Sequence, residues 1–184
     1  MTLKPTLFTI GHSTHPPERF LALLDHHGIE ALADIRRFPG SRKHPQFNRD
    51  DLAGALQRAG IDYHWLQALG GRRGKGRDGS SNLGLHNASF RNYADYMLTP
   101  EFREGVAGLL EIAERKSTVL MCAESLFWRC HRRLVSDFLT AMGITVQHIM
   151  PTGALRPHTL TPGAVIREGA VTYPGESAAV GRSA

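Results

Sequence analysis

Reactive side chains are concentrated between Cys122 and Arg133. A thiol and a carboxylate, Cys122 and Glu124, follow an apolar run, and a second thiol, Cys130, is followed directly by His131. These residue types suit three kinds of chemistry: attack by a thiol on a phosphate, metal binding by thiolates and an imidazole, and proton transfer by a carboxylate with a histidine. The spacing of the residues distinguishes between the three.

The first hypothesis makes Cys122 a nucleophile, with arginines holding the oxygens of a phosphate. A strand followed by a loop and a helix favours it, because backbone N–H groups and the helix dipole stabilise a thiolate and a phosphate. The spacing opposes it, because the interval from Cys122 to Arg129 is one residue longer than in loops that resemble those of tyrosine phosphatases. Glu124, inside the loop, would also repel a phosphate.

The second hypothesis is a metal site built from Cys122, Cys130 and His131, completed by Glu124 or His12. The interval between the two cysteines matches no usual zinc-binding spacing. A helix predicted over 128–142 also separates Cys130 from His131, because neighbouring helical residues point about 100° apart. We therefore predict no metal or other cofactor, keep this site as an alternative, and interpret Cys130 as a small, partly buried helical side chain.

The third hypothesis assigns proton transfer to Glu124 and His12, with Cys122 and His131 shaping or supporting the site. Burial or a neighbouring charge can bring the pKa values of glutamate and histidine towards neutrality. The structural alternatives are an internal salt bridge between Glu124 and an arginine, and a hydrogen bond between His12 and the backbone. The residues that we expect to bind an anion are Arg36, Arg42, Arg129 and Arg132.

Apolar, β-prone runs alternate with helical patterns along the chain, which predicts a parallel sheet covered by helices. The predicted strands are 7–10, 29–35, 61–66, 119–122 and 144–149, and the predicted helices are 17–27, 50–59, 90–97, 102–116 and 128–142. The expected fold is a single α/β domain of three layers, with about five mainly parallel strands, Rossmann-like and doubly wound. We expect this domain over 1–150 and an appendage packed on it over 151–176, in which 165–166 and 171–173 form a small hairpin or an edge pairing. A disordered tail is expected over 177–184.

In an open α/β sheet, ligands bind outside the carboxyl ends of the strands. The loops after the predicted strands are polar, and we expect them to converge on one cleft rich in histidine and arginine. The residues expected to support this cleft are Gly11, Ser13 and Asp34.

Composition indicates an ordinary globular chain of 184 residues, with 41% hydrophobic residues and a formal net charge of +5. The positive charge allows an anionic small molecule or a nucleic acid as partner. The sequence has neither an apolar run long enough to cross a bilayer nor the start of a secretory signal, and it has only two cysteines. We therefore expect a cytoplasmic protein with reduced thiols and no membrane partner.

Several short motifs, in this order, resemble the family called domain of unknown function 488 over about residues 7–149. The motifs are Thr9-Ile10-Gly11-His12-Ser13, Asp34-Ile35-Arg36 with Pro39 and Ser41-Arg42, Leu69-Gly70-Gly71, Tyr93-Ala94-Asp95-Tyr96-Met97, Cys122-Ala123-Glu124 and Cys130-His131-Arg132. The resemblance implies a compact α/β domain with no established general activity, and it transfers no catalytic residue.

The glycine-rich, basic segment 70–84 is predicted to be an exposed loop. It lacks the phosphate-loop pattern, because Gly76 follows Lys75, but its basic residues suit a nucleic-acid backbone, with Phe47, Trp65 or Trp128 as stacking partners. These observations predict an enzyme that acts on a phosphate-bearing substrate, a nucleotide or nucleic acid, by hydrolysis or group transfer. A non-catalytic binding module is the alternative.

Overall fold

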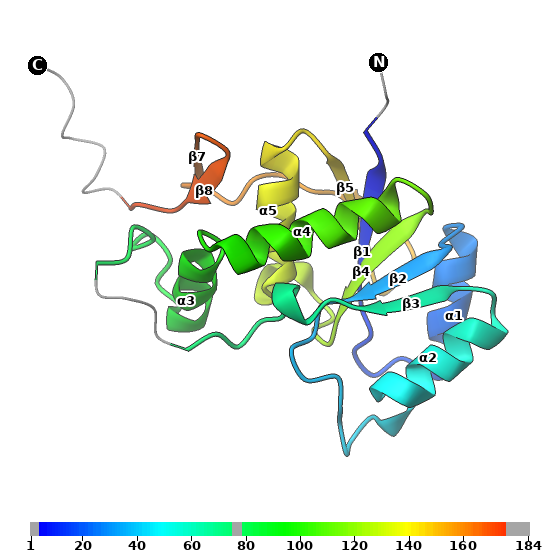
Figure 1. Cartoon of the computed structure of the whole chain (residues 1–184). Coiled ribbons are helices and arrows are strands. Elements are labelled where there is room, and N and C mark those ends of the chain that lie inside the picture. The colour runs from blue at the N-terminus through cyan, green and yellow to red at the C-terminus, as the bar shows by residue number, and fades with distance from the viewer. Residues whose placement is uncertain (1–3, 75–78, 176–184) are drawn as a thin grey trace, which may run out of the picture.

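A six-stranded sheet forms the centre of the protein (Figure 1). The computed structural model describes residues 4–74 and 79–175; the predicted tail 177–184 and the basic residues 75–77 of the predicted loop lie outside the described residues. The strands are β1 (Thr6–Gly11), β2 (Ala31–Asp34), β3 (Asp62–Trp65), β4 (Thr118–Cys122), β5 (Thr145–Ile149) and β6 (Leu155–Pro157), in the order β3-β2-β4-β1-β5-β6. The first five are parallel, as predicted, and the short edge strand β6 pairs antiparallel with β5.

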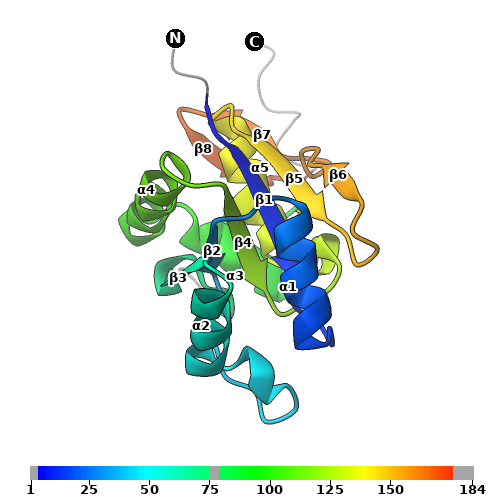
Figure 2. The ribbon, with the colours of Figure 1, turned by 90° about the vertical axis from the view of Figure 1, so that its right-hand side faces the viewer.

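Five helices flank the sheet on both faces, which confirms the predicted α/β fold (Figures 1 and 2). They are α1 (Pro17–His26), α2 (Arg49–Arg58), α3 (Ala88–Tyr96), α4 (Pro100–Ala113) and α5 (Arg132–Ala141), with three 3-10 turns, η1 (Pro45–Phe47), η2 (Gln67–Leu69) and η3 (Phe127–Arg129). Helices α1 and α2 supply one apolar cluster and helices α3, α4 and α5 supply the other. The apolar side of each helix therefore faces the sheet.

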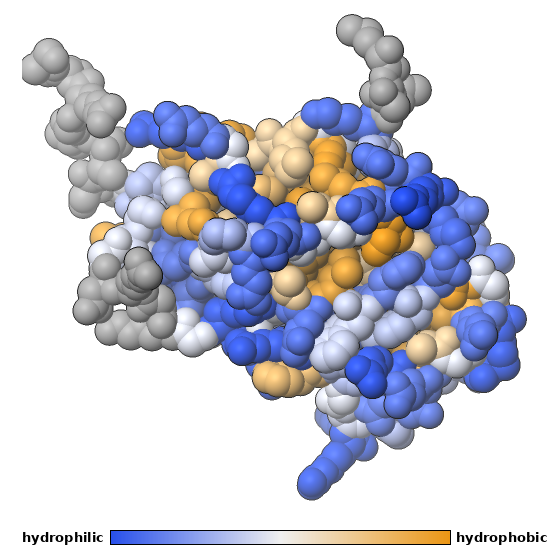
Figure 3. Space-filling view, in the orientation of Figure 1, coloured by the Kyte–Doolittle hydropathy of each residue, from blue (hydrophilic) through white to orange (hydrophobic). Residues whose placement is uncertain are grey.

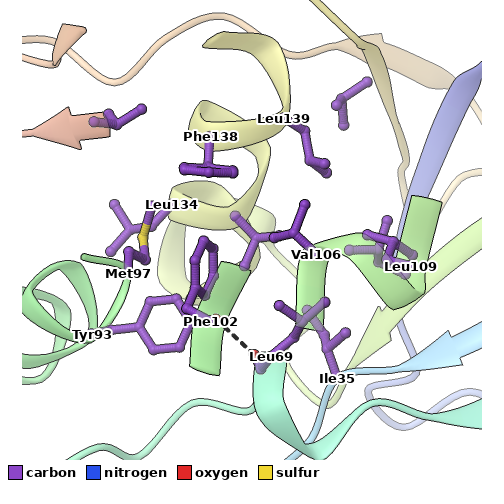
Figure 4. Close-up of a cluster of buried hydrophobic side chains, with 14 of the residues drawn as sticks. Ile35, Leu69, Tyr93, Met97, Phe102, Val106, Leu109, Leu134, Phe138 and Leu139 are labelled. Atoms are coloured by element: carbon purple, nitrogen blue, oxygen red, sulfur yellow. Dashed lines mark hydrogen bonds between the residues drawn. The ribbon is translucent and has the colours of Figure 1, made fainter. Parts of the chain in front are cut away.

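The larger cluster is built around Phe102 of α4 (Figure 4). Its ring packs edge-on against Phe138 of α5, with centroids 5.1 Å apart, and against Tyr93 of α3, at 6.2 Å. The hydroxyl of Tyr93 donates a hydrogen bond of 2.7 Å to the carbonyl of Leu69, so the buried tyrosine is satisfied. This contact joins α3 to the turn η2 that follows β3.

Helix α5 begins later than the sequence predicts. The expected helix over 128–142 is replaced by η3, an extended Cys130 with φ −128° and ψ 151°, and then α5 from Arg132. The backbone N–H of Arg132 donates to Sγ of Cys130 at 3.4 Å. Cys130 and His131 therefore occupy a corner before the helix, and the helical separation predicted for their side chains is wrong.

The strand order reverses between β1 and β4. The chain leaves β1 for α1 on one face of the sheet, and it leaves β4 for α5 on the other. Neighbouring parallel strands whose connections leave in opposite directions create a crevice at their carboxyl ends. The sheet thus places a crevice beside Gly11 and Cys122, which are partners in the β1–β4 register.

A buried chain of hydrogen bonds runs from Arg132 through the centre of the sheet. Arg132 donates to the hydroxyl of Thr9, whose Oγ1 lies 2.7 Å from Nδ1 of His148. Nε2 of His148 lies 2.9 Å from Nδ1 of His158, and Nε2 of His158 lies 2.8 Å from the carboxylate of Asp137. Because a carboxylate only accepts, Nε2 of His158 carries the hydrogen of the link to Asp137, and with both rings neutral the hydrogen of every link points towards Asp137.

The C-terminal segment packs against the domain through the same carboxylate. The hairpin of β7 (Val165–Arg167) and β8 (Ala170–Thr172) is as predicted, and it leads to Tyr173, whose hydroxyl donates to Asp137 at 2.6 Å. The backbone N–H of Tyr173 donates to Asn82, which is fully buried and also donates to Asp95. The prediction that 70–84 is an exposed loop is therefore wrong for Asn82, because this side chain bridges α3 and the C-terminal segment.

None of the helices in the described ranges is long and apolar enough to cross a membrane. Hydrophilic side chains cover most of the face seen in Figure 3, with smaller apolar areas between them.

The buried His148 makes stability depend on pH. Burial, followed by the charges of His158, Arg132 and Arg156, lowers the pKa of His148 to about 3. Below a pH of about 6.5, His148 is protonated in the unfolded chain but stays neutral in the folded chain. Its contribution therefore lowers the free energy of unfolding by up to about 1.4 kcal/mol for each unit by which the pH falls. Denaturation with urea should show a shallower loss of stability below pH about 6.5 in His148→Gln than in wild type.

The exposed histidine of α1 gives the matched control. His26→Gln should keep the wild-type slope. Equal slopes in His148→Gln and wild type would contradict the assignment of this pH dependence to His148.

Candidate functional site

One cavity of about 510 Å³ lies at the carboxyl ends of β1, β2 and β4. Segments after four elements line it: the loop after β1, the loop after β2, the turn after η2, and the β4–α5 connection. The lining includes all four of the predicted catalytic residues, Glu124, His12, Cys122 and His131. The polar residues of these loops therefore line the crevice that the strand order creates.

Two thiols and an imidazole meet on the wall of this cavity. Nδ1 of His131 lies 3.8 Å from Sγ of Cys122 and 3.6 Å from Sγ of Cys130, and the three atoms all lie within 4.8 Å of one another. Both cysteines are free and buried. Cys122 ends β4 and Cys130 lies before α5, so the corner between these elements brings the two sulfurs and the imidazole together.

The tautomer of His131 follows from its second nitrogen. Nε2 lies 3.1 Å from the carbonyl oxygen of Ile35, which can only accept, so Nε2 carries the hydrogen. In the neutral ring Nδ1 is then a lone pair that faces both sulfurs. Tyr93 packs edge-on against the ring, with centroids 4.9 Å apart, and holds its orientation.

Gly71 also permits this orientation of His131. A Cβ at Gly71 would lie 2.9 Å from Nδ1 of the histidine, closer than side chains tolerate. The Leu69-Gly70-Gly71 motif thus leaves space beside the ring. A Cβ at Gly70 would likewise lie too close to the backbone of Arg37.

Within this group the two thiols differ. Burial opposes ionisation of Cys130, but the hydrogen bond with Cys122 and the charges of His131 and Arg132 outweigh it and lower the pKa of Cys130. The hydrogen bond with Cys130 and burial raise the pKa of Cys122. Of the two sulfurs, Cys130 therefore carries the negative charge more readily.

Asp34 and Arg36 form a buried ion pair at the cavity, in which Arg36 is part of the lining and Asp34 is not. Nε and Nη2 of Arg36 donate to the two carboxylate oxygens at 2.9 and 2.6 Å, and Tyr63 donates to the same carboxylate at 2.7 Å. Nη1 of Arg36 donates to the carbonyl of Phe47 at 2.8 Å and contacts Nε2 of His12 at 3.3 Å. Most donors of Arg36 are therefore engaged within the protein.

His12 is held as a neutral ring by its neighbours. Nδ1 donates to the carbonyl of Ser13 at 3.0 Å, so the lone pair on Nε2 faces Arg36, and the ring stacks on Phe47 with centroids 4.3 Å apart. Burial is the main cause that lowers the pKa of His12 to about 4, opposed by the bond to Ser13 and assisted by the charge of Arg36. At neutral pH this histidine therefore forms hydrogen bonds as a neutral ring and does not act as a general acid.

Arg132 lies underneath the cavity and does not line it. Its Nη2 donates to the carbonyls of Glu124 and Ser125, and its Nη1 donates to Thr9. The side chain is 1% exposed, and its Nε has no partner among the described residues. Arg132 therefore fixes the loop that carries Glu124.

The loop that carries Glu124 crosses directly over Gly11. A Cβ at Gly11 would lie 1.8 Å from the carbonyl oxygen of Glu124, so this position requires glycine. Two residues later, Ser13 has a left-handed φ of 46° and donates its N–H to the carbonyl of Ala123 at 2.9 Å. The loops after β1 and β4 are thus fixed against each other, at the cost of strain in Ser13.

Glu124 is exposed and lines the cavity. Among the described residues it forms no ion pair with an arginine, so the internal salt bridge considered as an alternative is absent there; its carbonyl, and not its carboxylate, binds Arg132. Arg129 also lines the cavity and is exposed, whereas the exposed Arg42 lies outside the lining.

Other cavity residues were not among the predicted site residues. They include Arg37, Arg72, Phe38, His44, Phe90 and Tyr93. The sequence signals for Arg37 and Tyr93 were their places in or beside the motifs quoted above, whereas Phe90 reads as an ordinary apolar position of a helix.

The close approach at Gly11 predicts a large effect of one methyl group. Gly11→Ala should lower the free energy of unfolding by about 2 kcal/mol or more, because the added Cβ meets a backbone carbonyl that Arg132 holds in place. Urea denaturation measures this change. Gly108→Ala in α4, where the new Cβ meets open space, is the control and should be neutral or up to about 1 kcal/mol stabilising. Equal stability of both variants would contradict the described approach of the two loops.

Comparison with known proteins identifies a family. The family model described as domain of unknown function DUF488 matches residues 16–139, which include α1 to α4, the Cys122, Cys130 and His131 group, and most of α5. No curated protein and no solved structure matches the chain. Because the match covers more than half of the sequence, the chain belongs to the family described as domain of unknown function DUF488.

Proposed function

We propose that the protein is an enzyme that acts on a phosphate-bearing substrate, a nucleotide or nucleic acid, in the cavity at the strand ends. One observation carries the proposal: besides the buried Arg36, three further arginines, Arg37, Arg72 and Arg129, line the same cavity as Glu124. Guanidinium groups bind phosphate oxygens through paired hydrogen bonds, which are stronger than hydrogen bonds between neutral groups.

The cavity arginines and the buried arginines take different roles in this proposal. Arg129 is exposed and has no ion pair among the described residues, so its donors can reach a ligand. Arg36 and Arg132 are engaged with protein acceptors, and we assign them to positioning His12 and Glu124. Arg42, outside the lining, would contact only a longer ligand such as a nucleic-acid strand.

An exposed aromatic ring at the cavity supports a ligand that carries a base. Phe38 lines the cavity and is 62% exposed, and the guanidinium of Arg37 lies 5.5 Å from its ring centroid. Of the three aromatic residues proposed from the sequence for stacking, Phe47 is buried beneath His12, Trp65 donates to the carbonyl of Arg36, and Trp128 is exposed but lies outside the cavity lining. Base stacking is therefore proposed for Phe38.

Glu124 is the proposed proton acceptor. In a hydrolysis, the oxygen of water bonds to phosphorus, the bond from phosphorus to the leaving oxygen breaks, Glu124 takes a proton from the water, and the leaving oxygen takes a proton from solvent. In group transfer, a hydroxyl of the acceptor replaces the water. Neutral His12 supplies no proton and contributes a fixed contact with Arg36.

A binding module without catalysis is the second candidate. It is favoured by the neutral state of His12, because Glu124 then lacks a protonated histidine as acid partner at pH 7. In this case the same arginines hold the phosphate and nothing is turned over.

Removal of an accessible arginine tests the binding part of the proposal. Arg129→Ala should weaken binding of fluorescent single-stranded oligonucleotides or mononucleotides about tenfold, with a smaller salt dependence for the oligonucleotides, because one charged contact to phosphate is lost. Fluorescence anisotropy across a salt series measures both quantities. Arg58→Ala, an exposed arginine at the end of α2, removes the same charge away from the cavity and should leave affinity nearly unchanged. Equal effects of the two variants would refute a phosphate site in the cavity.

A second substitution separates an enzyme from a binding module. Wild-type protein is screened with nucleoside phosphates and oligonucleotides, and release of phosphate or cleaved strand is measured. Glu124→Gln should reduce any turnover by about a hundredfold or more and leave ligand affinity close to wild type, since the carboxylate acts only in the chemical step. Undiminished turnover would remove Glu124 from the mechanism, and binding without turnover in wild type would favour the binding module.

A further inference from the structure

We propose that Cys122, Cys130 and His131 form a site for a divalent, thiophilic metal ion such as zinc, with an open coordination position facing the cavity. The proposal concerns the wall of the cavity in which the proposed function takes place, but it rests on the arrangement of the three ligands alone. It holds or fails without any knowledge of the substrate.

The separations between the ligand atoms fit one metal ion. Tetrahedral zinc, with bonds of about 2.3 Å to sulfur and about 2.0 Å to nitrogen, requires sulfur and nitrogen to lie about 3.6 Å apart. Nδ1 of His131 lies 3.6 Å from Sγ of Cys130 and 3.8 Å from Sγ of Cys122. Both separations between nitrogen and sulfur therefore match a bound ion, and the two sulfurs lie within 4.8 Å of each other.

His131 is oriented as a metal ligand. Histidines that bind metals usually donate their other ring N–H to a carbonyl or carboxylate, which fixes the tautomer and directs the lone pair at the ion. Here Nε2 donates to the carbonyl of Ile35, and Nδ1 faces the sulfurs. The space that Gly71 leaves beside Nδ1 keeps this side of the ring open.

The surroundings also suit thiolate ligands. The backbone N–H of Arg132 donates to Sγ of Cys130, a contact that stabilises a negatively charged sulfur, and the guanidinium of Arg132 is buried close by. All three ligand residues line the cavity, so a fourth ligand can come from water or from a phosphate oxygen of a bound molecule. Three protein ligands with an open position are typical of catalytic zinc sites.

The choice of metal follows from the ligand types. Two thiolates and one imidazole favour zinc over magnesium or calcium, which prefer oxygen ligands. The competing interpretation, in which the two thiols and the imidazole only bind each other by hydrogen bonds, requires no ion and gives a different result in the experiment below.

The first experiment measures metal content and metal ligation in the full chain. Protein purified without chelators or added metal is subjected to elemental analysis, and metal-free protein is titrated with zinc and with cobalt(II). We expect about one ion per chain and, with cobalt, a charge-transfer absorption from thiolate to metal with visible bands of a tetrahedral centre. Absence of saturable zinc binding, or cobalt binding without the thiolate absorption, would overturn the proposal.

Variants then assign the ligands. Cys130→Ser and His131→Gln should each lower zinc affinity at least about a hundredfold. His44→Gln, which replaces another histidine of the same cavity, should bind zinc as wild type does. Circular dichroism of each variant shows whether it is folded; if the ligand variants do not fold, the cobalt spectrum of the wild-type chain decides. Zinc affinity that is equal in His131→Gln and His44→Gln would overturn the ligand set.

The outcome is distinguishable from that of the proposed function. Metal binding is measured without nucleotide, and nucleotide binding is measured with Arg129→Ala, which leaves all three metal ligands in place. Metal without nucleotide binding would sustain the metal site and refute the proposed function, whereas the reverse result would refute the metal site alone.

Discussion

The fixed position of the buried Arg132 is the constraint on which the site depends. A guanidinium that is 1% exposed needs acceptors within the protein, and its two terminal nitrogens find them in the carbonyls of Glu124 and Ser125 and in Thr9. Its charge is linked through the two buried histidines to the carboxylate of Asp137. One charged side chain thus joins the loop after β4, the centre of the sheet and the C-terminal segment.

The cavity follows from this constraint together with the strand order. Reversal of the order between β1 and β4 leaves a crevice, and the loop fixed by Arg132 crosses it above Gly11, where only a glycine fits. The corner before α5 then turns Cys130 and His131 back towards Cys122. Rigid backbone on both sides therefore presents thiols, imidazole and carboxylate to one space, as sites with precise geometry require.

The sequence predicted the parallel sheet, its flanking helices and the convergence of the loops, because each strand and helix carries a local apolar pattern. It missed β6, whose three residues are exposed and have no periodic pattern. It also missed the burial of Arg132 and the corner at Cys130, because both depend on partners far away in the chain, such as Thr9. Spacing rules for metal sites assume ligands on one local element, so they do not detect a group of side chains that tertiary packing brings together.

The buried chain of hydrogen bonds also sets an order on the maturation of the protein. Asp137, His158 and Tyr173 are made after every residue that lines the cavity, yet they terminate the network that holds Arg132. A nascent chain that has emerged only as far as α5 has Arg132 and Asp137 without the histidines that link them. Synthesis must therefore proceed past Tyr173 before the network beneath the cavity is complete, and a product truncated after α5 would have the reactive thiols without their final environment.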